Sequence, residues 1–287
     1  MSTLTPSLRL ESTHLEHPAS TRGGASASGR PEPSLPRISP LLLRWFQWYS
    51  RGYIRRHFHA VRMGGRIPAL GGRPLVGFVN HASWWDAMLL FLLGEQVAPG
   101  RRAYAPIDAE ALERYAMFKR MGLFGVEQNT ARGAVQFLKT SRALLSAPHT
   151  ALWLTPQGRF SDVRERPVKF DRGLGALARR SRDTCFLPVA MEYCFWGERL
   201  PEVLIWIGDP LQLRDGREGT SDAWSRLLEE RLAETQDTLA RACMERDPTQ
   251  FQTVLQGGSG VGRFYDFWRS TKARLRGESF SKEHGNQ

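Results

Sequence analysis

The stretch Pro74-Leu-Val-Gly-Phe-Val-Asn-His-Ala-Ser-Trp-Trp-Asp-Ala-Met-Leu-Leu-Phe-Leu-Leu93 indicates the fold class. Its first six residues are a short, mostly apolar run, which is typical of a buried strand. After a polar turn, a helix is expected from Trp84 to Leu93, because Ser83 is a good helix N-cap. A buried strand that leads directly into a helix is the building unit of an α/β domain.

The same alternation continues along the chain. Strands are expected at residues 57–63, 74–79, 103–107, 124–127, 150–154, 186–191 and 203–207, and helices at 84–93, 109–121, 131–146, 173–180 and 222–242. The sequence therefore predicts one α/β domain over residues 57–250, with a mixed sheet flanked by helices. Residues 1–40 are expected to be a disordered tail without a secretory signal, and residues 251–287 a flexible C-terminal segment.

Residues 41–56, Leu-Leu-Leu-Arg-Trp-Phe-Gln-Trp-Tyr-Ser-Arg-Gly-Tyr-Ile-Arg-Arg, predict an amphipathic helix. Arg44, Arg51 and Arg55 fall on one stripe of this helix, and aromatic side chains cover much of the rest. An apolar surface edged by arginines suits a helix that lies at a membrane interface. The alternative is a helix that packs on the core and turns its charged stripe to water.

Composition limits the class of protein. The chain has 287 residues, 41% of them hydrophobic, and no apolar run long enough for an ordinary membrane-spanning helix. Its net charge of +11 favours an anionic partner, which could be nucleic acid, a membrane surface or a phosphorylated substrate. Three cysteines without a CxxC pair fit neither a disulfide scaffold nor a zinc ribbon, and they favour a reducing compartment.

The strongest local signal is the segment Asn80-His81-Ala82-Ser83-Trp84-Trp85-Asp86, directly after a predicted strand. Ligands of open α/β sheets bind at the carboxyl ends of strands, and histidine suits proton transfer near neutral pH. If His81 lies on the turn and Asp86 in the first helical turn, the carboxylate can orient the imidazole. The alternative is a capping box, in which Asp86 binds only the backbone amide of Ser83.

A second signal is the turn Pro156-Gln157-Gly158, which follows the predicted strand 150–154. Exposed amides at this turn, beside guanidinium groups, would form an anion cradle. The alternative is a solvated charged loop. The basic residues that follow the turn are Arg159, Arg164, Arg166, Lys169 and Arg172.

In this order and spacing, the two signals resemble the lysophospholipid and glycerol-phosphate acyltransferase family. Asn80, His81 and Asp86 match its Asn-His-x4-Asp motif. Thr155-Pro-Gln-Gly-Arg-Phe-Ser161 is similar to its Phe-Pro-Glu-Gly-Thr-Arg-Ser motif at Pro156, Gly158 and Ser161. Further similar segments are Lys169-Phe-Asp-Arg-Gly173 with Leu177-Ala178, and Leu187-Pro188-Val189.

The chain departs from the family where arginines are expected to hold an acceptor phosphate. Gln128 stands at one of these positions and Phe160 at the other, while Gln157 replaces a glutamate. Arg159 and Arg132 lie close enough in sequence to compensate. A lipid alcohol without a phosphate, such as a glycolipid, therefore competes with lysophosphatidate as acceptor.

The resemblance implies an O-acyltransferase that moves an acyl group from acyl-CoA or acyl carrier protein to a lipid hydroxyl in phospholipid biosynthesis. His81 would be the general base and Asp86 its partner, with no bound cofactor, no metal and no nucleic-acid partner. Attachment would be peripheral, on the cytoplasmic face of a membrane. The substrate-binding residues implied are Asn80, Ser83, Pro156, Gln157, Gly158, Arg159, Lys169 and Gly173.

Three rival classes remain. A thioester or lipid hydrolase could use the same pair, although no GxSxG elbow is present. A nucleic-acid binder would fit the charge, but the basic residues do not interleave with aromatics on a recognisable module. A membrane scaffold with a dead site is disfavoured by the intact His81 and Asp86.

Overall fold

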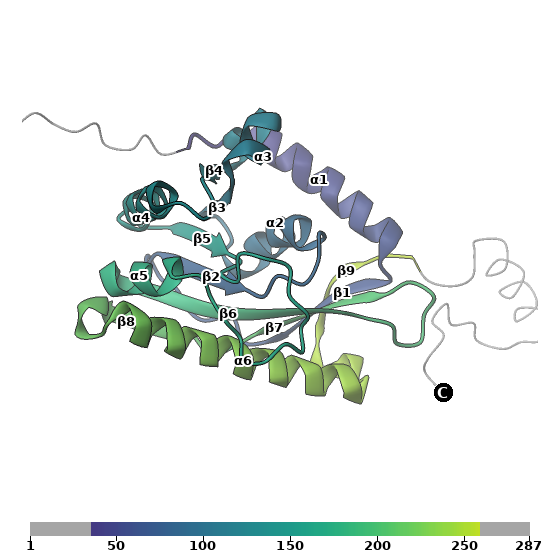
Figure 1. Cartoon of the computed structure of the whole chain (residues 1–287). Coiled ribbons are helices and arrows are strands. Elements are labelled where there is room, and N and C mark those ends of the chain that lie inside the picture. Colours follow the sequence, from purple (N-terminus) through teal and green to yellow (C-terminus); the bar gives the residue numbers. More distant parts are fainter. Residues whose placement is uncertain (1–35, 259–287) are drawn as a thin grey trace, which may run out of the picture. The chain divides into compact units, whose positions relative to one another are not determined.

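The computed structural model describes residues 36–258, and within them nine strands form one sheet with helices on both faces (Figure 1). The strands are β1 Ala60–Gly65, β2 Leu75–Val79, β3 Arg102–Asp108, β4 Leu123–Val126, β5 Thr150–Leu154, β6 Arg182–Cys194, β7 Glu202–Ile207, β8 Leu211–Asp215 and β9 Gln252–Gln256. The α-helices are α1 Pro40–His57, α2 Asp86–Val97, α3 Ala109–Arg114, α4 Ala131–Leu145, α5 Gly173–Arg180 and α6 Ser221–Glu245. Three short 3-10 helices are η1 Ala116–Met121, η2 Gly216–Glu218 and η3 Pro248–Gln250.

The strand order is β4-β3-β5-β2-β6-β7-β1-β9, and β8 pairs with β6 off this path. β4, β3, β5, β2 and β6 run parallel, so the carboxyl ends of β2, β3, β4 and β5 meet at one edge of the sheet. β7 and β8 run antiparallel to β6, and both pair with the side of β6 opposite to β2. The sheet is therefore mixed, as the sequence predicts.

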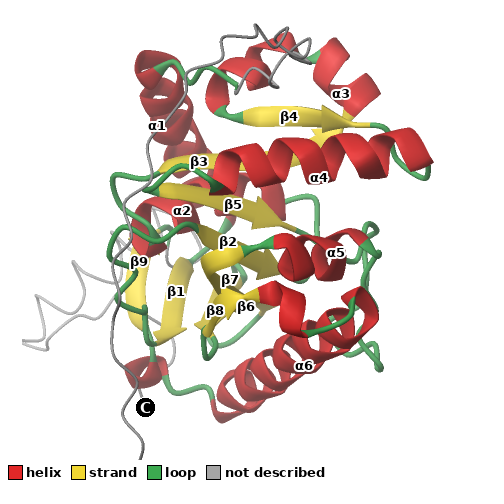
Figure 2. Ribbon diagram, turned by 90° about the vertical axis from the view of Figure 1, so that its left-hand side faces the viewer, coloured by secondary structure: helices red, strands yellow, loops and turns green. Residues whose placement is uncertain are grey.

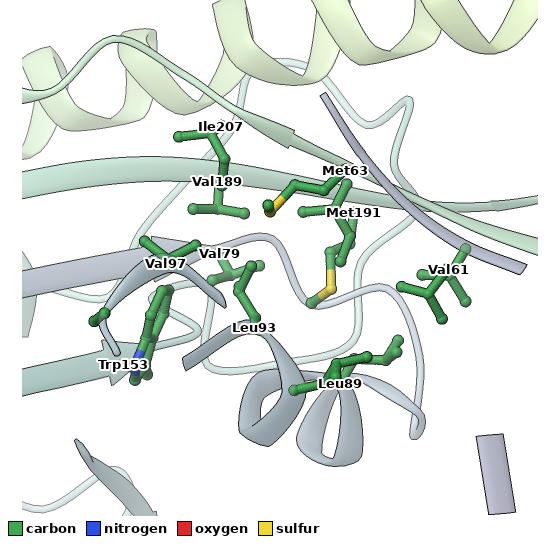
Figure 3. Close-up of a cluster of buried hydrophobic side chains, with 14 of the residues drawn as sticks. Val61, Met63, Val79, Leu89, Leu93, Val97, Trp153, Val189, Met191 and Ile207 are labelled. Atoms are coloured by element: carbon green, nitrogen blue, oxygen red, sulfur yellow. The ribbon is translucent and has the colours of Figure 1, made fainter. Parts of the chain in front are cut away.

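Alternation along β2 explains why both faces are covered. Leu75 and Val79 belong to a buried cluster with α2, whereas Val76 and Phe78 belong to a cluster with α4, α5 and α6. Figure 1 shows α2 and α6 on opposite sides of the central strands, and Figure 2 shows α4, α5 and α6 from a second direction. The α2 cluster includes Leu89, Leu93 and Met191 (Figure 3).

The strands and helices confirm the predicted fold class, and several segments differ from the prediction. The helix expected over 109–121 is broken at Tyr115, where the backbone leaves helical geometry (φ −120°), into α3 and η1. The edge strand β8 was not predicted, because its pattern is mostly polar and buries only Leu213.

The structure describes a few residues of the expected disordered tail (1–40) and flexible C-terminal segment (251–287), and these residues make tertiary contacts. β9 lies inside the segment 251–287 and pairs antiparallel with β1, burying Leu255. At the other end, Ile38 packs against the cluster of α4, α5 and α6, and the amide of Ser39 donates to the carbonyl of Arg120 at 2.7 Å. Tertiary contacts order these polar segments. Residues 1–35 and 259–287 lie outside the described residues.

Helix α1 has one packed face and one exposed aromatic face. Phe46 packs on Phe91 of α2, with ring centroids 4.9 Å apart, and Ile54 is buried. Arg51 does not join an outer stripe with the other arginines, because it forms an ion pair with Glu95 of α2. The exposed large side chains are Leu41, Trp45, Trp48 and Tyr49. No helix among residues 36–258 has the length and apolar character needed to span a bilayer.

Candidate active site

Asn80 anchors the turn that carries the candidate catalytic residues. Its side-chain amide donates to the carbonyl of Met191 at 2.9 Å, and its side-chain oxygen accepts from the Met191 amide at 2.7 Å. These bonds continue the pairing of β2 with β6 one step beyond Val79. Asn80 is buried and does not line the cavity described below.

His81 and Asp86 form the pair that the sequence predicts. His81 Nδ1 lies 2.7 Å from Asp86 Oδ2, and the Asp86 side chain is fully buried. The amide of Ser83 donates to the same oxygen at 3.0 Å. The contact with His81 and the capping contact with Ser83 therefore coexist, because one carboxylate oxygen of Asp86 makes both.

The helix after this turn begins later than expected. α2 starts at Asp86, and Trp85 takes the cap position without a side-chain bond. The Ser83 hydroxyl instead accepts from the amide of Trp85 at 3.3 Å inside the turn. Ser83 thus shapes the turn and does not line the cavity described below.

Tyr193 is a third member of the site that sequence reasoning missed. Its hydroxyl donates to Asp86 Oδ1, the carboxylate oxygen that His81 leaves free. Burial, and to a smaller extent the charge of Asp86, raise the pKa of Tyr193 well above the usual tyrosine value. The available signal was its spacing from Val189 and Met191, since residues two apart on a strand share a face.

The loop after β5 holds the backbone of His81 from both sides. Gln157 Oε1 accepts from the His81 amide at 2.9 Å, and the amide of Ser161 donates to the His81 carbonyl at 2.8 Å. The ring of Phe160 packs beside the imidazole, with centroids 4.4 Å apart. Gln157 is therefore a support for His81 and not part of the cavity wall.

Gly158 adopts a conformation that side chains resist. Its φ is +65°, and an added Cβ would lie 2.0 Å from Asp171 Oδ2. The amide of Asp171 in turn donates to the carbonyl of Pro156 at 2.8 Å. The amide of Gly158, one of the amides expected to form the anion cradle at this turn, already donates to the Thr155 carbonyl at 3.2 Å.

Most of the basic run after this turn is neutralised by neighbouring acids. Arg172 is the exception, since its guanidinium has no ion-pair or hydrogen-bond partner among the described residues, and it lines the cavity. Arg132, the other candidate to compensate, is highly exposed and lies 3.7 Å from Glu127. The ion pairs of the run are Arg159–Glu165, Arg164–Asp162, Arg166–Asp237 and Lys169–Glu229.

A cavity of about 860 Å³ extends from His81 along β3. Its walls are mainly apolar and come from both faces of the sheet. Of the predicted site residues, His81, Pro156, Gly158 and Gly173 line it, whereas Asn80, Ser83, Asp86, Gln157, Arg159 and Lys169 do not. Other wall residues are Leu43 of α1, Leu90 and Phe91 of α2, Ile107 of β3, Gln128, Phe137 of α4, Trp153 of β5 and Leu174 of α5.

The cavity lies where the sheet opens. β3 pairs with β5 only through Arg102–Tyr104, and its remaining residues pair with β4. The strand residues just beyond the β3–β5 pairing, among them Ala105, Pro106 and Leu154, line the cavity. A gap between two strands thus lets an apolar space run beside the sheet edge that carries His81.

A histidine that is paired with a buried carboxylate can act as a general base toward a molecule bound in the adjoining apolar cavity. Nδ1 of His81 is engaged by Asp86, which leaves Nε2 for proton transfer. Among residues 36–258, no group of three or more His, Cys, Asp or Glu side chains could hold a metal ion.

Comparison with known proteins gives a family match and a similar solved structure. Residues 57–192, which are 136 of the 287 residues, match the family model described as Acyltransferase. A similar solved structure is the crystal structure of the 1-acyl-sn-glycerophosphate (LPA) acyltransferase, PlsC, from Thermotoga maritima. It is 18% identical, with a TM-score of 0.49, over 69% of this chain and 79% of that chain. No curated protein sequence matches the chain.

Proposed function

We propose that the protein transfers a fatty acyl group from a thioester, acyl-CoA or acyl carrier protein, to a hydroxyl of a membrane lipid, in glycerolipid synthesis. The observation that carries this proposal is the His81–Asp86 pair at one end of a largely apolar cavity. A cavity of about 860 Å³ lies in the usual range of ligand pockets and suits an alkyl chain.

His81 acts as the general base in this proposal. Nε2 takes the proton of the acceptor hydroxyl as its oxygen forms a bond to the thioester carbonyl carbon, and Asp86 stabilises the imidazolium. When the tetrahedral intermediate collapses, the carbon–sulfur bond breaks and the proton passes from the imidazolium to the leaving thiolate. General-base catalysis of this kind contributes roughly 10²–10⁴-fold.

Arg172 is our candidate for holding an anionic group of a substrate. It is the basic residue of the 159–172 run that lines the cavity, and its charge is not neutralised within the described residues. Arg172→Ala should raise the KM for an anionic substrate about tenfold, since a bond to a charged group contributes about 1.5–3 kcal/mol. Arg164→Ala is the matched control. It also removes one positive charge, but Arg164 is already paired with Asp162 and does not line the cavity. Equal effects of the two variants would contradict this role.

The acceptor is lysophosphatidate by default, and an uncharged lipid alcohol is the second candidate. Two uncharged side chains favour the second: Gln128 lines the cavity and Phe160 packs on His81, at the positions where the family resemblance predicts arginines. A panel of lysolipid and alcohol acceptors with labelled acyl-CoA and acyl carrier protein separates the two. Strong preference for lysophosphatidate would reject the uncharged acceptor.

The exposed face of α1 is our candidate for peripheral attachment to a membrane, which we place on the cytoplasmic side. Trp45 and Trp48 point away from the packed face, and Arg44, Arg55 and Arg56 are exposed on the same helix. Aromatic rings with arginines around them suit the boundary between acyl chains and anionic headgroups.

His81→Ala and Asp86→Asn test the core of the proposal in purified protein. We expect His81→Ala to lower acyl transfer by at least a hundredfold with a retained unfolding midpoint. Release of free acid without an acceptor, at the rate of transfer, would instead identify a hydrolase. Full activity of His81→Ala would reject this site.

A further inference from the structure

The carboxylate of Asp86 has no contact with solvent and depends on protein donors. Oδ2 accepts from the Ser83 amide and lies 2.7 Å from His81 Nδ1. Oδ1 accepts from the Tyr193 hydroxyl. Without Tyr193, one oxygen of a fully buried carboxylate would lose its donor, which is costly for a charged group.

Tyr193 reaches this position because β6 extends beyond the last residue of β2. Pairing of the two strands ends at Val79 and Val189, and Tyr193 lies four residues further along β6. The bonds between Asn80 and Met191 hold this overhang in register. The Tyr193 ring packs on the Phe58 ring, with ring centroids 5.9 Å apart. This packing orients the Tyr193 side chain.

We infer that Tyr193 is a positioning residue for acyl transfer, whose hydroxyl holds the carboxylate of Asp86 in line with His81 and shares its negative charge. The inference rests on the proposed roles of His81 and Asp86. A carboxylate that already accepts a hydrogen bond on Oδ1 binds the imidazolium less tightly. The hydroxyl of Tyr193 therefore limits how much of the carboxylate charge acts on the imidazole of His81.

The ionisable groups near His81 come from several elements. Asp86 belongs to α2 and Tyr193 to β6, and His57 of α1 packs on Trp85, next to Asp86 in the chain. The loop residue that contacts the imidazole, Phe160, is uncharged. The titratable residues that share the cavity wall with His81 are Glu95, Arg101, Tyr104, Asp108, Glu127, Asp171 and Arg172.

Tyr193→Phe removes the hydroxyl and keeps the ring. We expect kcat to fall about tenfold with KM little changed, because one hydrogen bond to a charged group is lost. The full charge of Asp86 then acts on the imidazole, so the acidic limb of the kcat/KM profile should move up by about half a pH unit to one unit. Tyr115→Phe, at an exposed tyrosine outside the cavity wall, is the matched control and should change neither.

A double-mutant cycle separates positioning from general destabilisation. In an Asp86→Asn background, Tyr193→Phe should have almost no further effect on kcat, since its partner is already altered. Equal losses in both backgrounds, or an unmoved acidic limb in folded Tyr193→Phe, would overturn the inference. His81→Ala is measured alongside: if it stays active, the proposed site fails, and if it is inactive while Tyr193→Phe matches wild type at every pH, only this inference fails.

Discussion

At the scale of single residues, the site is built by backbone support of one histidine. The amide and carbonyl of His81 are both engaged by the loop after β5, through Gln157 and Ser161. Its Nδ1 is engaged by Asp86. These three contacts leave little freedom for the ring, which is the preorganisation that proton transfer requires.

Asn80 supplies a prediction at this scale. Asn80→Ala would leave the amide and carbonyl of Met191 buried without their partners, which should lower the free energy of unfolding by about 2–4 kcal/mol. Urea unfolding followed by tryptophan fluorescence measures this. Gln212→Ala, which removes one exposed bond to Arg73, is the control and should cost less than about 1 kcal/mol. Similar losses in both variants would contradict the anchoring role.

At the scale of elements, β6 and α1 contribute most to the candidate site and to the candidate membrane surface. β6 is 13 residues long and carries the anchor for Asn80 and the tyrosine bound to Asp86 beyond the end of β2. α1 has two different faces. Leu43 and Gln47 line the cavity. Trp45 and Trp48 are exposed. One helix thus forms part of the binding cavity and carries the candidate membrane surface.

The second prediction concerns α1. Replacing Trp45 and Trp48 together by aspartate should lower partitioning onto phosphatidylglycerol vesicles at least tenfold. In the unchanged protein, each indole ring leaves water for the bilayer, and burial of this apolar surface stabilises the bound state. Vesicle co-sedimentation measures the partitioning, and acyl transfer to a short-chain soluble acceptor reports that the site is intact. Val135→Asp on α4 is the control, since Val135 is 66% exposed against 73% for Trp48. Unchanged partitioning of the double variant would reject the membrane surface.

At the scale of the whole fold, the cavity depends on the separation of β3 from β5. Elements distant in sequence supply its walls: α1 and α2 on one face, α4 and α5 on the other, and β3 between them. Six of the seven residues of β3, Ala103–Asp108, line the cavity, so it follows most of this strand.

The third prediction concerns this cavity. Ala105→Phe would place a ring in a space lined by β3, and the KM for long-chain acyl donors should rise about tenfold while short-chain donors are affected less than threefold. Ala131→Phe, at an exposed residue outside the cavity wall, is the control. Equal effects on long and short chains would show that the cavity does not hold the acyl group.

The sequence by itself determined the α/β class, the mixed sheet and the His81–Asp86 pair. Each of these depends on local pattern: apolar runs of strand length, helix periodicity, and a histidine and an aspartate five residues apart after a strand. For the same reason the polar strands β8 and β9 escaped prediction, because their order comes from pairing with β6 and β1.

Only the tertiary structure decided which polar groups belong to the site. It paired Arg159 with Glu165 and Lys169 with Glu229, and it gave Arg172 no partner among residues 36–258. It also brought Tyr193 onto Asp86 across 107 residues of sequence. It also separated β3 from β5 to make the cavity. Ion pairs, strand overhangs and gaps depend on residues far apart in the chain, and spacing along a sequence carries no information about those distances.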